Sequence, residues 1–193
     1  MTSGMMKESE RCGVALKKAV EGQIVALVSS GDSGVYGMAG LAMEMAEAEE
    51  LKIAIEVIPG VSAANAAASQ LGAPLMLDSA TISLSDLLVP WEQIITRLKA
   101  VAAADMVVSL YNPRSKKRVK HLVEAAKIFR QHRPGTTPVG IVTAACDPDQ
   151  EIIYSDLDHF LDEEIGMRSL VIIGNCSTRI IDGHMVTPRG YYK

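Results

Sequence analysis

The stretch VSSGDSGVYG, residues 28–37, constrains the fold most, because it joins an apolar run to a helical pattern. Residues 24–27 before it are all apolar and predict a strand, whereas MAGLAMEMAEAEE after it has apolar residues at helical spacing. Glycines 31, 34 and 37 allow positive φ and a close approach of the backbone to a ligand. A strand, a Gly-rich loop and a helix in this order are typical of an α/β fold with a ligand at the strand end.

The first third of the chain repeats this alternation. Residues 7–22 predict a helix that Gly22 closes, residues 52–60 a strand and a turn, and residues 61–72 a small-residue helix that ends at Gly72. The order α-β-α-β-α indicates a parallel sheet with crossover helices. Beyond residue 78 the helical period is lost, so we expect an N-terminal α/β domain over 1–77 and a C-terminal α/β domain over 78–193.

The second part also reads as α/β, and its sheet could be mixed. The patterns predict strands at 105–113, 138–145 and 169–175, helices at 91–104, 119–132 and 155–166, and a hairpin that turns at Asp182 and Gly183.

Composition narrows the class of protein. Of the 193 residues, 48% are hydrophobic but only 4% aromatic, and the net charge of −4 argues against general nucleic-acid binding. No apolar run approaches the ~20 residues of a membrane span, and the N-terminus lacks a signal-peptide pattern, so we expect a soluble, cytoplasmic protein. The cysteines Cys12, Cys146 and Cys176 lack metal-ligand spacing, so we expect buried free thiols and no metal site.

Four loops follow predicted strands and could line one cleft: SSGDSGVYG, PGVSAAN, YNPRSKKR and TAACDPD. Asp32 could accept hydrogen bonds from ribose hydroxyls or an amino group, although a Gly-rich turn with a polar cap explains this loop taken alone. Its spacing is neither G-x-G-x-x-G nor G-x-x-x-x-G-K-[ST], which favours a nucleoside without a phosphate.

Two further loops carry distinct signals. In PGVSAAN, Ser62 stands where a helix N-cap would stand, and the alanines after it leave space for a flat ligand. In YNPRSKKRVK the basic side chains indicate either a solvated helix start or a site for a multiply anionic substrate. The four histidines, His121, His132, His159 and His184, are scattered, and surface or packing roles are expected for them.

The segments SSGDSGVYGMAGL, EVIPGVSAANAAASQLGAPL, ISLSDLLVPW, LYNPRSKKR and TPRGY, in this order, resemble the tetrapyrrole methylases over essentially the whole chain. ISLSDLL-x-PW and LYNPRS resemble the cobalamin-pathway members that methylate C17 of precorrin-3B, or of its cobalt-containing counterpart, with ring contraction. The resemblance implies two α/β domains, S-adenosylmethionine (SAM) between them, a tetrapyrrole substrate and a homodimer.

Carried over by motif, the resemblance implies these SAM-binding residues: Gly31, Asp32, Val35, Tyr36, Ser62, Ala63, Tyr111, Asn112, Thr143, Ala144 and Ala145. The implied substrate carries many carboxylates, which basic side chains can pair. The expected substrate contacts are Arg114, Lys116, Lys117 and Arg118. Ring contraction needs a proton donor or acceptor, or an electrophilic stabiliser, and the candidates at the strand ends are Asp86, Ser85, Tyr111 and Arg114.

One departure from the family pattern matters. Family members open with a strand that ends in a G-x-G-P-G loop, and this strand and loop are absent here. The first sheet of the family has the order 3-2-4-1-5, in which the opening strand lies between the two strands that match the segments around Val25 and Val57. We therefore expect an incomplete first domain with unpaired backbone groups. A truncated form, a mis-called start or half of a split protein would each explain this. The alternatives are another methyltransferase of the superfamily, acting on RNA ribose or diphthine, and an inactive fragment or binding module.

Overall fold

The computed structural model describes residues 7–115 and 118–191, so the predicted substrate contacts Lys116 and Lys117 lie outside the described residues. By its contacts the chain divides into two compact units, Met1–Ser62 and Ala63–Lys193, called here the first and the second unit. This division falls before the boundary expected at residues 77 and 78, because the helix that follows Ser62 packs on the sheet of the second unit.

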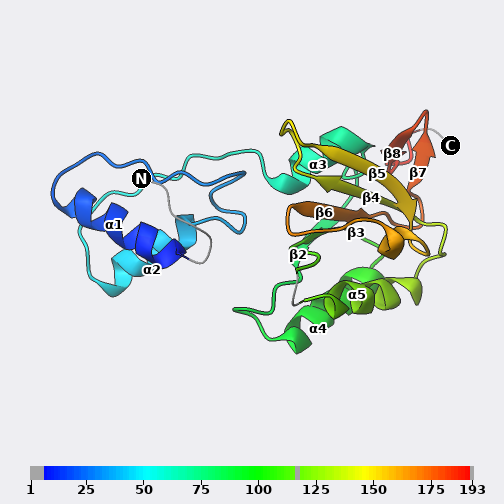
Figure 1. Ribbon diagram of the computed structural model, residues 1–193, viewed down its shortest axis with the longest axis horizontal. Helices are drawn as coiled ribbons and strands as arrows, with labels where there is room; N and C mark the ends of the chain where they lie inside the picture. The colour runs from blue at the N-terminus through cyan, green and yellow to red at the C-terminus, as the bar shows by residue number, and fades with distance from the viewer. Residues whose placement is uncertain (1–6, 116–117, 192–193) are drawn as a thin grey trace. The chain divides into compact units, whose positions relative to one another are not determined.

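The described part of the first unit contains two helices, α1 (Glu8–Val20) and α2 (Ala39–Ala48) (Figure 1). Acidic residues in the first turn of α1 and lysines in its last turn complement the helix dipole. Gly22 follows with a φ of 86°, the left-handed conformation that ends many helices, as predicted. Cys12 of α1 packs with Met38 and Ala42 in a small core.

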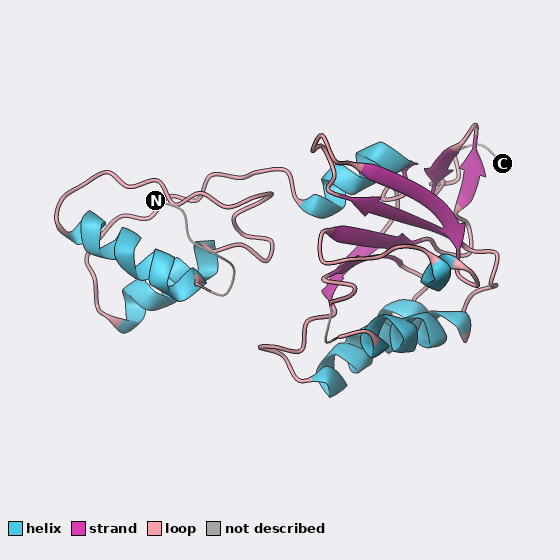
Figure 2. Cartoon of the chain, viewed as in Figure 1, coloured by secondary structure: helices cyan, strands magenta, loops and turns pink. Residues whose placement is uncertain are grey.

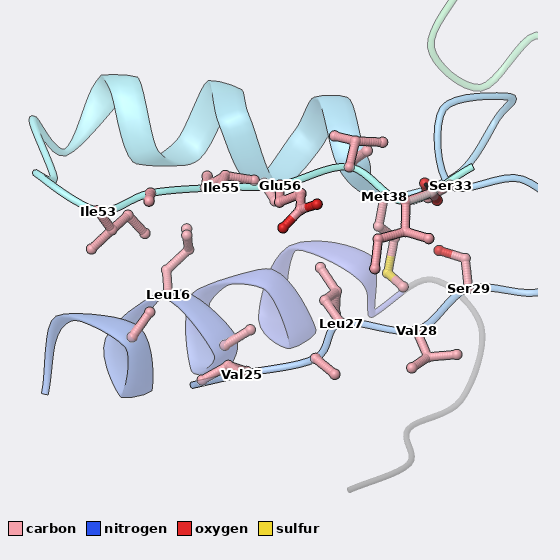
Figure 3. A pocket seen from close by; sticks show the side chains of 18 of the residues that line it. Leu16, Val25, Leu27, Val28, Ser29, Ser33, Met38, Ile53, Ile55 and Glu56 are labelled. Atoms are coloured by element: carbon pink, nitrogen blue, oxygen red, sulfur yellow. Dashed lines mark hydrogen bonds between the residues drawn. The ribbon is translucent and has the colours of Figure 1, made fainter. Parts of the chain in front are cut away.

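The strands predicted around residues 24–27 and 52–60 are wrong: the structure assigns neither segment to a strand. Both line a cavity of about 910 Å³ within the first unit, and Figure 3 shows Leu27 on one side of it and Ile53 and Ile55 on the other. A strand requires a neighbouring strand that pairs with its backbone, and neither segment has one among the described residues. Ile24, Val28 and Ile58 are correspondingly exposed.

The second unit is built on a mixed five-stranded sheet of order β2-β3-β6-β4-β5. β2, β3 and β4 run parallel to one another, because β2 pairs parallel with β3 and both β3 and β4 pair antiparallel with β6. β3 and β6 lie inside the sheet and are almost entirely buried, which explains their largely apolar sequences. The strands are β2 (Ser79–Ser83), β3 (Val107–Tyr111), β4 (Pro138–Thr143), β5 (Glu151–Asp156) and β6 (Ser169–Ile173).

Helices cover both faces of this sheet (Figures 1 and 2). α3 (Ala63–Leu71) packs its alanines and Leu71 against one face. α4 (Trp91–Ala103) and α5 (Lys120–Arg130) pack on the other, around Leu98 and Phe129. The second unit is therefore a three-layer α/β structure.

A small second sheet, of order β1-β8-β7, completes the second unit. Its strands are β1 (Gly72–Ala73), β7 (Arg179–Ile181) and β8 (His184–Val186). β7 and β8 form an antiparallel hairpin that turns at Asp182 and Gly183, as predicted.

The helix predicted over residues 155–166 is wrong. The segment opens inside β5, an edge strand that the sequence analysis missed, and only η1 (Phe160–Asp162), a 3-10 turn, is helical. Asp156 explains the break, because its carboxylate accepts the backbone N–H groups of Asp158 and His159, each at 3.0 Å. Such a side-chain cap favours a turn over a continuing helix.

The expectation of three buried thiols is also wrong in part. Cys12 is buried, whereas Cys146 and Cys176 are exposed because they lie in loops after β4 and β6. In the described ranges no helix is both long and apolar enough to cross a membrane.

Candidate functional site

In the first unit, Asp32 joins the Gly-rich loop to the loop that contains Gly60. Its Oδ1 accepts the N–H groups of Gly34 and Val35 at 2.8 and 3.1 Å, and its Oδ2 accepts that of Gly60 at 2.9 Å. Ser33 Oγ donates to the carbonyl of Ile58 at 3.2 Å. A Cβ on Gly60 would collide with the carbonyl oxygen of Gly31, so glycine is required for this approach. The two loops predicted to bind SAM in this unit therefore lie together.

The electrostatics of Asp32 follow from these bonds. The N–H groups of Gly60 and Gly34 lower the pKa of the Asp32 carboxyl below its ordinary value, against a weaker opposing effect of desolvation. Three N–H groups use three of roughly four lone-pair sites on a carboxylate, which leaves room for one more donor. Tyr36, further along the loop, has a φ of 54°, a left-handed conformation that is uncommon for non-glycine residues.

In the second unit the carboxyl ends of β2, β3 and β4 lie at one edge of the sheet, because these strands are parallel. Ser83, Tyr111 and Thr143 end them. The predicted site residues that follow these strand ends are thereby brought to one edge: Ser85, Asp86, Asn112, Arg114, Ala144 and Ala145.

Tyr111 links this edge to the start of α3. Its hydroxyl accepts the backbone N–H of Ala64 at 2.8 Å, which places Tyr111 next to the predicted contact Ala63. Asn112 and Ala144, the first residues beyond β3 and β4, have φ angles of 50° and 51°. Left-handed conformations of non-glycine residues cost energy and persist where the surroundings enforce them, which is common at functional sites.

The loop after β4 is held by two residues that the sequence analysis missed. Gln150 Oε1 accepts the N–H of Cys146 at 2.6 Å, and Gln150 Nε2 donates to Gln70 Oε1 of α3 at 3.0 Å. This link joins the loop that contains Ala144 and Ala145 to α3. No sequence motif marks either glutamine.

On the face covered by α4 and α5, the loop after β2 meets the start of α5. Arg118 donates to Ser85 Oγ at 3.3 Å and to the carbonyl of Asn112 at 3.1 Å, and its Nη1 lies 3.9 Å from Asp86 Oδ1. His121 Nε2 lies 3.0 Å from Asp86 Oδ2. Asn112 Nδ2 in turn donates to Ser83 Oγ at 3.0 Å.

These contacts decide which groups are available to a ligand. The side chain of Arg118 is only 14% exposed, and its two terminal nitrogens bond to Ser85 and Asn112. The Nε atoms of both Arg114 and Arg118 are buried and have no hydrogen-bond partner among the described residues. Desolvation raises the pKa of Asp86, but its own backbone N–H, His121 and Arg118 together lower it below the ordinary value. Asp86 is therefore ionised at neutral pH. His121, expected at the surface or in packing, is partly buried and pairs with it.

Comparison with known proteins places the chain in a family. The sequence pattern of the Tetrapyrrole (Corrin/Porphyrin) Methylases matches residues 3–160, and the chain belongs to this family. The solved "methyltransferase CobJ" has a TM-score of 0.86 and 36% identity over 94% of this chain and 77% of that one. The predicted resemblance and the α/β fold class are thus confirmed.

Two curated relatives are similar over almost the whole chain. A "Probable cobalt-factor III C(17)-methyltransferase" of Salmonella typhimurium is 47% identical over 98% of this chain and 78% of its own length. A "Cobalt-factor III methyltransferase" of Priestia megaterium is also 47% identical, over 100% of this chain. The chain spans only 36% of the Priestia protein.

Proposed function

We propose that this chain transfers a methyl group from SAM to C17 of cobalt-factor III, the cobalt-containing tetrapyrrole of cobalamin biosynthesis, with contraction of the ring. The 47% identity with the Salmonella protein, over 98% of this chain, carries the proposal. The cobalt-containing form is preferred to metal-free precorrin-3B because both relatives described above are named for it. A homodimer stays a prediction from the resemblance, and a cytoplasmic location stays a prediction from the sequence pattern.

The residues present suit SAM. Asp32 keeps a lone pair for a ribose hydroxyl or an amino group, and Ser62 and Ala63 follow the Gly60 loop. At the sheet edge Tyr111 and Asn112 lie at the end of β3, and the small side chains of Ala144 and Ala145 after β4 suit contact with a flat ring. The predicted contacts Gly31, Val35, Tyr36 and Thr143 border these positions.

SAM supplies a methyl group that is already activated, so no nucleophile or metal is required of the chain. The task of its residues is to align the acceptor carbon and to exclude water. Arg114, with a buried and unbonded Nε, is the side chain proposed to pair a substrate carboxylate. Because Arg118 is bonded to Ser85 and Asn112, we assign it to holding the loop rather than to binding substrate directly.

Ring contraction adds a proton transfer. An ionised Asp86 can accept a proton or orient His121, but it does not donate a proton at neutral pH. The hydroxyls of Ser85 and Tyr111 remain the proposed donors, and Arg114 the proposed stabiliser of a developing negative charge.

The test is a turnover assay with cobalt-factor III and isotopically labelled SAM, read by mass spectrometry. The proposal requires a labelled methyl group at C17. Arg114→Ala should raise the KM for the tetrapyrrole at least about tenfold and leave the Kd of S-adenosylhomocysteine within about twofold. An effect confined to the cofactor would contradict the role of Arg114. Binding of cofactor without any transfer would favour the binding-module alternative.

A further inference from the structure

The loop between β2 and α4, residues 84–90, exposes two leucines. Leu87 is 69% exposed and Leu88 is 90% exposed, although Leu84 at the start of the loop is fully buried. Single exposed leucines are common on protein surfaces. Two in succession, on a loop fixed at both ends, require an explanation.

The first stem of the loop is fixed to β3 and to the residues that open α5. Leu84 N donates to the carbonyl of Tyr111 at 2.9 Å, and Ser85 N donates to Ser83 Oγ at 3.2 Å. Asp86, directly before the leucines, lies 3.0 Å from His121 and 3.9 Å from Arg118. The backbone therefore enters the leucine pair from an anchored position.

The second stem is fixed by α5 as well. Trp91 Nε1 donates to Glu124 Oε2 at 3.0 Å, and the centroid of the Trp91 ring lies 4.0 Å from that of His121. Val89 packs against the main core, and Pro90 restricts the backbone before α4 begins. With both stems held, Leu87 and Leu88 are kept in solvent rather than folded back onto the protein.

The groups that neighbour this loop bear on which ligand the leucines would suit. The loop follows β2 and Arg114 follows β3, and these strands are neighbours whose ends are joined by the bond from Leu84 to Tyr111. An apolar contact and a cation at one sheet edge suit a ligand with a wide apolar face and anionic groups at its rim. A tetrapyrrole with carboxylate side chains has this chemistry.

We propose that Leu87 and Leu88 bind the apolar face of the tetrapyrrole and that His121, acting through Asp86, is a positioning residue for this loop. The inference rests on the proposed function and deepens it by naming the substrate contact. Burial of two leucine side chains under a ring removes their apolar surface from water, and this favours binding.

The test uses uroporphyrin III, a planar tetrapyrrole with carboxylate side chains, titrated against the chain by fluorescence. The double variant Leu87→Ser, Leu88→Ser should raise the Kd of this probe at least about tenfold. Its Kd for S-adenosylhomocysteine should stay within about twofold. The matched control is Ile180→Ser, which alters a half-exposed apolar residue of β7 and should leave both values unchanged.

The positioning role is tested at His121. His121→Ala should speed amide exchange over residues 85–89 and weaken uroporphyrin III binding, whereas His121→Gln, which can still donate to Asp86, should restore most of both. Equal effects of the two variants would overturn the positioning role.

Other outcomes separate the explanations. Unchanged uroporphyrin III affinity in the leucine variant would overturn the contact, and a loss of self-association in sedimentation instead would assign the leucines to a protein interface. A chain that binds S-adenosylhomocysteine but not uroporphyrin III would overturn this inference and leave the proposed SAM site standing. A chain that binds neither would contradict the proposed function as well.

Discussion

Both units contain extended segments of similar apolar character, but these segments form strands in only one of the two units. In the second unit, residues 107–111 and 169–173 are hydrogen-bonded on both sides and buried. In the first unit, residues 24–28 and 52–58 flank a cavity of about 910 Å³ and form no ladder with any described residue. Apolar, β-branched sequence thus makes a strand only where a neighbouring strand satisfies its backbone.

The largest expected effect is a difference in hydrogen exchange between the units. Amides of residues 107–110 and 170–173 should be protected at least about a thousandfold more than those of residues 24–28 and 53–57, because only the former are in ladders and buried. Mass spectrometry of pepsin fragments measures this. Equal protection in the two units would show that the first unit has a complete sheet in solution.

The next effect concerns core packing. Leu110→Ala in β3 should lower the free energy of unfolding of the second unit by about 3 kcal/mol, since it leaves a cavity at a fully buried position. Trp91, the chain's single tryptophan, lies in that unit and reports its unfolding in urea. Val25→Ala, a truncation beside the existing cavity, is the matched control and should leave this transition unmoved.

A smaller effect is expected where the two loops of the first unit meet. Gly60→Ala should lower the free energy of unfolding of the first unit by about 1–3 kcal/mol, because the new methyl group would collide with the Gly31 carbonyl. The melting temperature of this unit should fall accordingly. Gly40→Ala should instead stabilise the first unit. Gly40 lies inside α2 with open space around it, and alanine favours a helix over glycine by about 1 kcal/mol. Circular dichroism melts compare the two, and a neutral Gly60→Ala would refute the close approach.

The smallest effect is a pH dependence of the same loops. The pKa of Asp32 is lower in the folded chain than in the unfolded one, so its link to Gly60 is fully present above the ordinary carboxyl pKa. The link is lost as the pH falls through the lowered folded value. Exchange-sensitive NMR of the Gly34 and Gly60 amides should show this loss, and Asp32→Asn should show it already at neutral pH. Glu49→Gln, an exposed change on the same unit, should not.

Much of the fold could be predicted from local patterns. The small-residue period of α3, the closing Gly22 after α1 and the turn at Asp182 and Gly183 are each signalled by neighbouring residues, and the structure confirms them. The predictions that failed concern strands, which depend on pairing with residues far away in the sequence. Residues 24–27 have no pairing strand among the residues that the structure describes, whereas the missed edge strand β5 exists because β4 is beside it.

The candidate site was predictable in part for the same reason. Tyr111, Asn112 and Ala144 follow apolar strand patterns, so their place at one sheet edge could be expected from topology. Gln70 and Gln150 could not, because their hydrogen bond joins residues far apart in the sequence and carries no motif. Likewise, the pairing of His121 with Asp86 appears only once α5 is placed beside the loop after β2.

The most direct test of the account is isothermal titration of the unaltered chain with S-adenosylhomocysteine, with Asp32→Ala measured in parallel. The account predicts saturable binding of one ligand per chain that Asp32→Ala weakens at least about tenfold, since a charged acceptor and the link between two loops are lost together. Absence of binding by the unaltered chain, or equal binding by both, would contradict it.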